Sequence, residues 1–307
     1  MRAIKLIQYP SGGLTLPPLA IALGFFDGVH IGHRALIKKM KEEAALRSLA
    51  TAIFTFGSEN ESLKRGVTRL YSTAEKLDIL ASLGVDYLIV ADFSAIAGAE
   101  PEKFVKEHLV GALNCRLAAV GYNFRFGRGA AADADTLSGL MTSLGREAII
   151  LPEERFEGAP LSTTEIRAAL SRGDCRLAAR MLGAPYYITA VVEHGRGIGK
   201  AFGFPTLNTK KQDGTPLPRG VYATVVEIGE ERHIGVTNVG TCPTFGEREE
   251  HLETMLLDFD RKIYGERVRI HFIERLRDEE IFPTPEALKA QIDRDAERAT
   301  ALTRDYI

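Results

Sequence analysis

The sequence predicts two domains of different class: an α/β domain with a parallel sheet, followed by an antiparallel β-barrel that a final helix closes. Three observations support this. In the first half of the chain, apolar strand-like runs alternate with helical patterns. In the second half, strands follow one another through glycine-rich turns. The length of 307 residues suits two domains of roughly 150 residues each.

The composition is that of a globular protein with a substantial core, since 45% of the residues are hydrophobic and 26% are charged. The formal net charge of -2 provides no basic surface of the kind that binds nucleic acid non-specifically, so we expect no nucleic-acid partner. The three cysteines, Cys115, Cys175 and Cys242, are far apart in the sequence. This scatter indicates neither a disulfide framework nor a thiolate metal site.

The first residues lack the long apolar stretch of a signal peptide. No apolar run reaches the roughly 20 residues that a membrane-spanning helix needs. We therefore expect a cytoplasmic protein without a membrane partner. The sequence does not fix the oligomeric state, and a homo-oligomer stays open.

The first half of the chain predicts a parallel sheet, because its strands are separated by helices long enough for right-handed crossovers. In such a sheet, ligands bind at the carboxyl ends of the strands. The predicted strands are 19–24, 50–56, 85–90, 116–121 and 147–151, and the predicted helices are 34–49, 73–83, 101–113 and 133–144.

A further helix begins at Ser162, which has capping-box spacing to Glu165, and its pattern runs to residue 182, where Gly183 indicates the end. The strand pattern then changes, which places the domain boundary near 183–186 and gives domains 1–183 and 184–307. The predicted strands of the second domain are 187–193, 220–228, 233–238, 253–259 and 268–272, and its final helix is 284–303.

The segment from Gly24 to His33, Gly-Phe-Phe-Asp-Gly-Val-His-Ile-Gly-His, lies between the first predicted strand and the first predicted helix. Its glycines permit a sharp turn and a close approach of backbone to ligand. The helix start offers free N–H groups to a phosphate, and His30 and His33 add two donors. Nucleotidyl transfer requires such an arrangement, because its catalysis is mostly positioning and stabilisation of charge on phosphorus. The alternative is a glycine-containing loop with two incidental histidines.

Two further segments support this interpretation. Ser162, Thr164 and Arg167 place hydroxyls and a cation at a helix start, where they are suited to hold a triphosphate, although alone they indicate only a well-capped helix. Asn123 lies in an aromatic segment at the carboxyl end of a predicted strand. It is suited to bind the edge of a base or a flavin, while core packing explains the aromatic residues equally well.

The second domain opens with a glycine-dense segment, 194–208, whose backbone N–H groups are suited to hold phosphates. It is not a Walker A loop, because no Gly-Lys-Ser/Thr follows. Thr206 and Asn208 offer hard oxygen ligands for a Mg²⁺ shared with ATP. Glu253 begins an apolar predicted strand, where a carboxylate is suited to accept the proton of a primary alcohol. A glycine-rich hairpin and a solvated glutamate are the alternatives.

Together these segments resemble the prokaryotic bifunctional riboflavin kinase/FAD synthetases. The histidine loop, the segment around Asn123 and the helix start at Ser162 are similar to the nucleotidyltransferase half of that family. Gly-Phe-Pro-Thr-x-Asn at 203–208, Asn-Val-Gly-Thr-x-Pro-Thr at 238–244 and Glu-Thr at 253–254 are similar to its kinase half. The resemblance implies a Rossmann-like nucleotidyltransferase domain that adenylylates FMN to FAD, and a barrel domain that phosphorylates riboflavin, with ATP and Mg²⁺.

The resemblance also implies roles for individual residues. Glu253 is the implied catalytic base of the kinase, His30 and His33 act in adenylyl transfer, and Thr206 and Asn208 bind Mg²⁺. The carboxyl-terminal region, which includes 276–279, helps to cover the flavin. The implied nucleotide and flavin contacts are Gly24, Phe26, Asp27, Gly32, Asn123, Ser162, Thr164, Arg167, Gly195, Gly197, Gly203 and Asn238.

The sequence departs from the family pattern at three places. A Pro-His-Pro-like segment usually follows the Thr-Phe of the second strand, where this chain has Gly57 and Ser58. Asn123 stands at a usual aspartate, and Cys242 at a frequent arginine. Two alternatives therefore stay open: a riboflavin kinase with weak or lost FAD synthetase activity, and a flavin-responsive binding protein without turnover.

Overall fold

The protein is described by a computed structural model that covers residues 4–10, 15–57, 69–193, 206–210, 217–241 and 250–307. These residues form two compact units, Met1–Leu161 and Ser162–Ile307. The first contains a parallel sheet and the second a closed antiparallel barrel with a carboxyl-terminal helix, so both predicted fold classes are confirmed.

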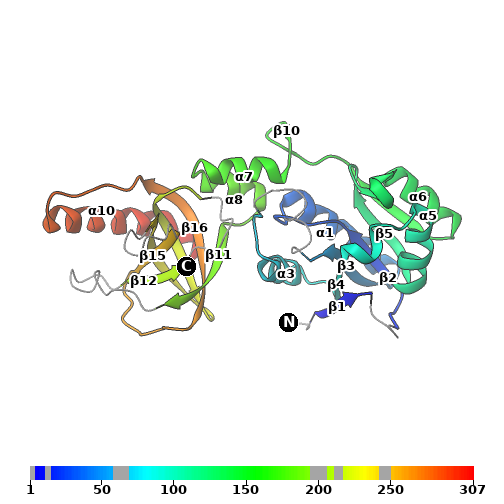
Figure 1. The fold of residues 1–307 in the computed structure, drawn as a ribbon, viewed down its shortest axis with the longest axis horizontal. Coiled ribbons are helices and arrows are strands. Elements are labelled where there is room, and N and C mark those ends of the chain that lie inside the picture. Colours follow the sequence, from blue (N-terminus) through cyan, green and yellow to red (C-terminus); the bar gives the residue numbers. More distant parts are fainter. Residues whose placement is uncertain (1–3, 11–14, 58–68, 194–205, 211–216, 242–249) are drawn as a thin grey trace. The chain divides into compact units, whose positions relative to one another are not determined.

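The first unit is built on a six-stranded parallel sheet of order β1-β4-β3-β2-β5-β8 (Figure 1). The chain moves outward from β2 through β3 to β4 and then returns to the other side of β2 to form β5. The topological switch point of the sheet therefore lies between the neighbouring strands β2 and β5. The strands are β1 Lys5–Tyr9, β2 Leu19–Leu23, β3 Ala50–Phe56, β4 Tyr87–Ala91, β5 Cys115–Gly121 and β8 Glu147–Leu151.

Each predicted strand of this sheet is present, and β1 is an edge strand that the sequence did not predict. The inner strands are almost wholly buried, with Leu19 and Ile21 fully inaccessible, because helices cover the faces of a parallel sheet. The helices are α1 Ile31–Leu46, α3 Thr73–Ser82, α4 Phe93–Ile96, α5 Pro101–Lys103, its continuation as the π-helix η1 Phe104–Ala112, and α6 Ala134–Ser143. Short elements are β6 Arg125–Phe126, η2 Arg128–Ala130, β7 Ala132–Asp133, β9 Arg155–Phe156 and β10 Ala159–Pro160.

The second unit begins with two helices, α7 Thr163–Ser171 and α8 Cys175–Leu182, where the sequence predicted one continuous helix. Gly173 separates them with a left-handed backbone, φ +76°. Gly183 ends α8 in the left-handed conformation, as predicted. The closed barrel has the order β11-β12-β15-β14-β13-β16. Its strands are β11 Tyr186–Glu193, β12 Thr206–Lys210, β13 Gly220–Ile228, β14 Glu231–Thr241, β15 Glu250–Leu256 and β16 Arg267–Arg277.

Successive side chains along each barrel strand point to opposite faces of the sheet, one inside the barrel and one outside. One face is packed inside the barrel with Tyr222 and Phe272, and it contains a buried chain of threonine hydroxyls. Thr237 lies at the centre of this chain, 2.9 Å from the Oγ1 atoms of both Thr224 and Thr254. The opposite face carries α10 Pro285–Thr303, which is followed by η3 Arg304–Tyr306 and packs on β13, β14 and β16 (Figure 1).

Helices α7 and α8 belong to the same compact unit as the barrel. Helix α8 packs against β11 and β16, its residues Cys175 and Ala178 are buried, and Arg176 forms an ion pair with Glu274 on β16. The chain therefore divides into compact units before α7. The functional boundary that we expect near Gly183 stays a prediction.

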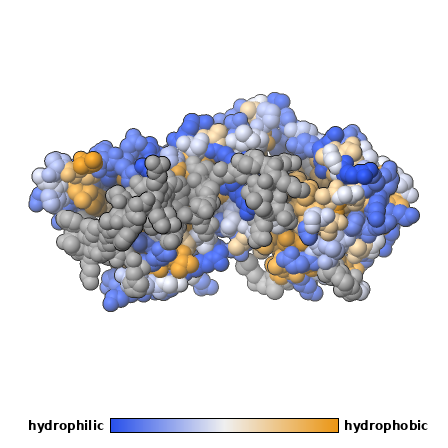
Figure 2. Space-filling view, viewed as in Figure 1, coloured by the Kyte–Doolittle hydropathy of each residue, from blue (hydrophilic) through white to orange (hydrophobic). Residues whose placement is uncertain are grey.

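The surface in Figure 2 is mostly hydrophilic, with apolar residues in separate groups. No helix within the described ranges has both the length and the apolar character to cross a membrane.

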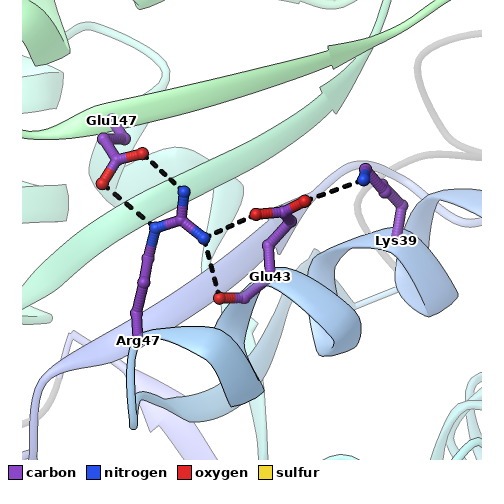
Figure 3. Close-up of polar contacts among 4 residues, drawn as sticks. All are labelled: Lys39, Glu43, Arg47 and Glu147. Carbon is purple, nitrogen blue, oxygen red and sulfur yellow. Dashed lines mark hydrogen bonds and ion pairs between the residues drawn. The ribbon is translucent and has the colours of Figure 1, made fainter.

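An ion-pair network joins α1 to β8 at the amino ends of the parallel strands (Figure 3). The Arg47 guanidinium, just after α1, donates to both carboxylate oxygens of Glu147, at 3.1 and 2.8 Å, and also to Glu43. Lys39 donates to the other oxygen of Glu43 at 2.7 Å. Hydrogen bonds from Lys39 and Arg47 lower the pKa of the Glu43 carboxyl, and Arg47 lowers the pKa of Glu147.

We expect Arg47→Met to lower the Tm of the first unit by about 1–3 °C at pH 7, because exposed ion pairs contribute little individually. The folded-state pKa values of both glutamates are depressed, so this stabilisation is present above their unfolded pKa. It is lost as the pH falls through their folded values. Thermal melts from pH 7 down to about pH 3 measure the effect. Lys39→Met, which removes one bond, is the control with a smaller effect, and a Tm difference that persists undiminished in acid would contradict the assignment.

Two candidate active sites

The histidine loop leaves the carboxyl end of β2 at the switch point of the parallel sheet. Gly24 N donates to Phe54 O on the neighbouring β3 at 3.2 Å. The loop then takes left-handed backbone conformations at Phe26, Gly28 and Val29, with φ of 52°, 79° and 40°. Such conformations cost free energy at non-glycine residues, and they persist where the surroundings enforce them. Here Phe26 and Val29 are buried, which anchors the loop in the core.

The two predicted histidines lie together at the start of α1. His30 is the N-cap, and its Nδ1 accepts a hydrogen bond from the backbone N–H of His33 at 3.4 Å. The two rings stack with centroids 3.7 Å apart and an interplanar angle of 18°. Gly32 permits this packing, because a Cβ at that position would lie 3.3 Å from the His30 ring. The structure therefore brings together the histidines and the helix N-terminus that the sequence predicted.

Both histidines are neutral near pH 7. Burial lowers the pKa of His30 to about 4. The pKa of His33 lies well below 6.5, mainly because of burial and then because of the nearby charges of His30 and Lys76. Because Nδ1 of His30 is an acceptor, the neutral ring carries its proton on Nε2. The pair therefore offers neutral hydrogen-bonding groups to a phosphate in addition to the positive end of the helix dipole.

The other predicted residues of the first unit differ in accessibility. The ring of Phe26 faces the interior, 5.2 Å from the His33 ring, so a ligand contact from Phe26 would come from its backbone. Asp27 is half-buried in the loop. Asn123 is exposed in the turn after β5, the strand next to β2. The histidine loop and Asn123 therefore follow the carboxyl ends of two neighbouring parallel strands.

Ser162, Thr164 and Arg167 lie at the amino end of α7, in the second unit. The side chain of Ser162 caps this helix by accepting a hydrogen bond from Glu165 N at 3.3 Å. Thr164 is exposed and Arg167 is half-buried. Their participation in one site with the histidine loop stays a prediction.

The second candidate site is a row of polar side chains across three neighbouring barrel strands. Glu253 on β15 is directly opposite both Asn208 on β12 and Asn238 on β14. Residues that pair in this way share a face, with Cβ atoms about 5 Å apart. Glu253 is exposed. It lies in the middle of β15, whereas the sequence predicted it at the start of a strand.

This row lies on the outer face of the barrel, the face that carries α10. Thr206 is two residues before Asn208 and therefore on the same face of β12. It pairs with Met255, which belongs to the apolar cluster that packs against α10. The side chains of Thr206, Asn208, Glu253 and Asn238 therefore lie on the same barrel face as the residues that pack against α10.

Glu279, just after β16, reaches this row from the carboxyl-terminal side. Its Oε1 accepts a hydrogen bond from Asn238 Nδ2 at 3.2 Å. The carboxylate lies so close to Gly240 that a Cβ there would be 2.3 Å from Oε1. The segment that carries Glu279 is held by Arg277, whose Nε donates to the buried Asp295 of α10 at 2.9 Å.

Comparison with known proteins assigns both halves. A family model of riboflavin kinase matches residues 182–303, and one of FAD synthetase matches residues 15–165. The bifunctional riboflavin kinase/FMN adenylyltransferase of Escherichia coli K12 is 35% identical over 296 residues, which cover 95% of this chain and 93% of that protein. The enzyme of the same name from Listeria monocytogenes is 33% identical over 294 residues, 92% of this chain and 91% of the relative.

The chain belongs to the bifunctional riboflavin kinase/FMN adenylyltransferase family. The crystal structure of a macrolide-efflux protein from Streptococcus pneumoniae has a similar fold, with a TM-score of 0.86, 29% identity and coverage of 96% of this chain and 99% of that one. The histidine loop and Asn123 fall within the FAD synthetase match. Thr206, Asn208, Asn238 and Glu253 fall within the riboflavin kinase match.

Some expectations from the family resemblance lie outside the described residues. These are the glycine contacts Gly195, Gly197 and Gly203, the departure at Cys242, and Ser58 in the loop that replaces the Pro-His-Pro-like segment. Gly57 itself is described, directly after β3.

One residue beside the histidine loop was not recognised in the sequence. Lys76 on α3 is buried, and its Nζ donates to the carbonyl oxygen of Phe25 at 3.1 Å. In the sequence, Lys76 is only a charged residue within a predicted amphipathic helix, and nothing there indicates that it is buried.

We expect His30 and His33 to remain neutral when the pH is lowered from about 8 to 5, because burial disfavours the imidazolium form. Histidine ring resonances followed by NMR against pH measure this directly. The expected result is an apparent pKa of about 4 for His30 and a lower-than-normal value for His33. Normal titration of either ring near pH 6.5 would show that the pair is open to water.

Proposed function

We propose that the second unit phosphorylates riboflavin to FMN with ATP, and that the first unit adenylylates FMN to FAD with a second ATP and releases pyrophosphate. The observation that carries this is the row Asn208–Glu253–Asn238, which places an exposed carboxylate between two amides within the riboflavin kinase match. The neutral histidine pair at the switch point of the FAD synthetase match supports the second activity.

In the kinase half, Glu253 is the proposed catalytic base. Its carboxylate takes the proton of the terminal hydroxyl of riboflavin as that oxygen attacks the γ-phosphorus of ATP, and ADP leaves. The oxygens of Thr206 and Asn208 fit a Mg²⁺ chemically, because hydroxyl and amide oxygens are hard ligands on one face of β12. When bound, Mg²⁺ neutralises charge on the ATP phosphates. Asn238, held by Glu279, contacts the flavin or nucleotide.

In the adenylyltransferase half, an FMN phosphate oxygen attacks the α-phosphorus of ATP and pyrophosphate leaves. The proposed role of His30 and His33 is to hydrogen-bond the phosphate oxygens on which charge accumulates. Gly24, Asp27 and Gly32 shape the loop. Ser162, Thr164 and Arg167 are proposed to bind the triphosphate, and Asn123 the base or flavin. The proposed partners are these small molecules alone, in the cytoplasm.

Glu253→Gln should reduce FMN formation by about 10²–10⁴-fold, the usual contribution of a general base. The same variant should convert supplied FMN to FAD at the rate of the unmodified protein. His33→Ala should have the reverse effect, with FAD formation reduced by about 10²–10³-fold, as for loss of one oxyanion donor. Chromatography of the flavins after incubation with ATP, Mg²⁺ and riboflavin or FMN measures both rates.

The unmodified protein in this assay separates the alternatives. FMN without FAD would favour a riboflavin kinase that has lost FAD synthesis, and no product would favour a flavin-responsive binding protein. Near-normal kinase activity in Glu253→Gln would refute the role of that residue.

We expect the fragment 162–307 to fold cooperatively and to phosphorylate riboflavin, because it contains the barrel, α10 and the helices packed on the barrel. The shorter fragment 184–307 keeps the polar row but loses the buried face of α8, so its Tm should be lower by several degrees. Thermal melts and kinase assays of both fragments test the boundary near Gly183. A folded 162–307 fragment without kinase activity would show that the first unit contributes to the kinase site.

A further inference from the structure

Lys76 connects the histidine loop to the end of β3. Its side chain is 4% exposed. Its Nζ donates to Phe56 O at 2.8 Å and to Phe25 O at 3.1 Å, and it lies 3.4 Å from Thr55 Oγ1. Phe56 is the last residue of β3, whereas Phe25 is in the histidine loop, so a side chain from a third element, α3, joins the two.

Burying an ammonium group is energetically unfavourable, so Lys76 is an unusual choice of residue to join two segments. Removing a lysine charge from water is unfavourable unless hydrogen bonds replace the lost hydration, and an apolar side chain at this position would avoid that penalty. The buried position of Lys76 therefore calls for an explanation in terms of what its charge and its hydrogen bonds do at the site.

The hydrogen bonds act on the strained part of the loop. Phe25 directly precedes the left-handed segment at Phe26, and its carbonyl oxygen accepts from Thr55 Oγ1 at 2.9 Å as well as from Lys76. At the other end of that segment, Val29 O accepts from Arg34 Nε at 3.2 Å. Strained backbone keeps its conformation only where neighbouring groups enforce it. Lys76 is one of the groups that do so, at the end of the segment where the loop leaves the sheet.

The charge acts on His33. Burial is the main reason that the pKa of His33 is lowered, and the nearby charges of His30 and Lys76 lower it further. Of the other ionisable groups nearby, Glu154 has its Cβ about 3.3 Å from where a Cβ of Gly32 would lie, and Asp27 lies in the loop itself. A fixed positive charge here adds to the positive end of the α1 dipole, at the position where phosphate charge accumulates.

We propose that Lys76 is a positioning residue for adenylyl transfer: its ammonium holds the Gly24–His33 loop on the end of β3 and brings a positive charge near His33. This rests on the proposed FAD synthesis in the first unit. Lys76 acts through the loop and through His33.

The test compares Lys76→Met with Lys41→Met in the full chain. Lys41 also donates its Nζ to a backbone carbonyl, Leu83 O at 2.6 Å, and this hydrogen bond joins α1 to the residue that ends α3. Three quantities are measured for each variant: FMN formation from riboflavin, FAD formation from FMN, and the pKa of His33 by NMR.

Lys76→Met should lower FAD formation by about 10- to 100-fold, the scale of a small misplacement of reacting groups. It should raise the pKa of His33 above that of the unmodified protein and leave FMN formation unchanged. Lys41→Met should leave all three near their starting values. If Lys76→Met does not fold, Lys76→Gln, which keeps two donors without the charge, takes its place in the same measurements.

FAD formation within about twofold of the unmodified protein in Lys76→Met, or an unchanged pKa of His33, would overturn the proposal, because the misplacement argued above predicts a much larger loss. An equal loss in Lys41→Met would also overturn it, since the effect would then be general destabilisation of α1 and α3. An unmodified protein that makes FMN but no FAD would contradict the proposed FAD synthesis instead, and the pKa of His33 would still report on the charge of Lys76.

Discussion

The left-handed backbone at Phe26, Gly28 and Val29 is the constraint on which the first candidate site depends. Two non-glycine residues in this conformation cost roughly 1–3 kcal/mol each, and the buried side chains of the same two residues offset that cost. The turn they make lets His30 cap α1, and Gly32 leaves room for its ring over the helix start. The groups that we propose to hydrogen-bond phosphate are therefore held in place by the fold itself, and such preorganisation lowers the ordering cost of binding.

The barrel places its site by a different constraint, the alternation of side chains along a strand. Thr254 and Glu253 are neighbours in sequence, yet Thr254 completes a buried hydroxyl chain inside the barrel and Glu253 is exposed on the outer face. The interior hydroxyls bond to one another, so their polarity is satisfied without water. A shift of one residue in the register of β15 would exchange these two faces and move the carboxylate inside.

The two candidate sites also differ in how far their proposed reactive side chains are buried. Burial keeps the histidine pair neutral, which suits groups that hydrogen-bond phosphate oxygens without exchanging protons near pH 7. Glu253, the proposed proton acceptor, is instead exposed on the outer face of the barrel, where an alcohol can reach it from solution. Folding of each unit therefore sets the chemistry of its site through burial as much as through residue type.

The two fold classes could be predicted from the sequence, because the patterns that indicate them are local. Apolar runs, helical patterns and glycine-rich turns identified most strands of the sheet and the barrel, and the predicted histidine loop is a single contiguous segment. Two short strands, β1 and β12, were not predicted, because neither has a clear apolar pattern. Strand β1 has mostly accessible residues at a sheet edge, and β12 follows a glycine-dense segment. The break between α7 and α8 at Gly173 was not predicted, because the helical apolar pattern continues on both sides of it.

The contacts between residues far apart in the sequence became visible only in the tertiary structure. Lys76 is buried beside Phe25 although 51 residues separate them, and Glu279 meets Asn238 across 41 residues. Neither pairing has a local signal, because each depends on how α3 packs on the sheet and how the chain leaves β16. The row through Glu253 likewise required the pairing of β12, β15 and β14, which is set by barrel closure and strand register. Local patterns specify which groups a chain carries, whereas packing and register specify which of them meet.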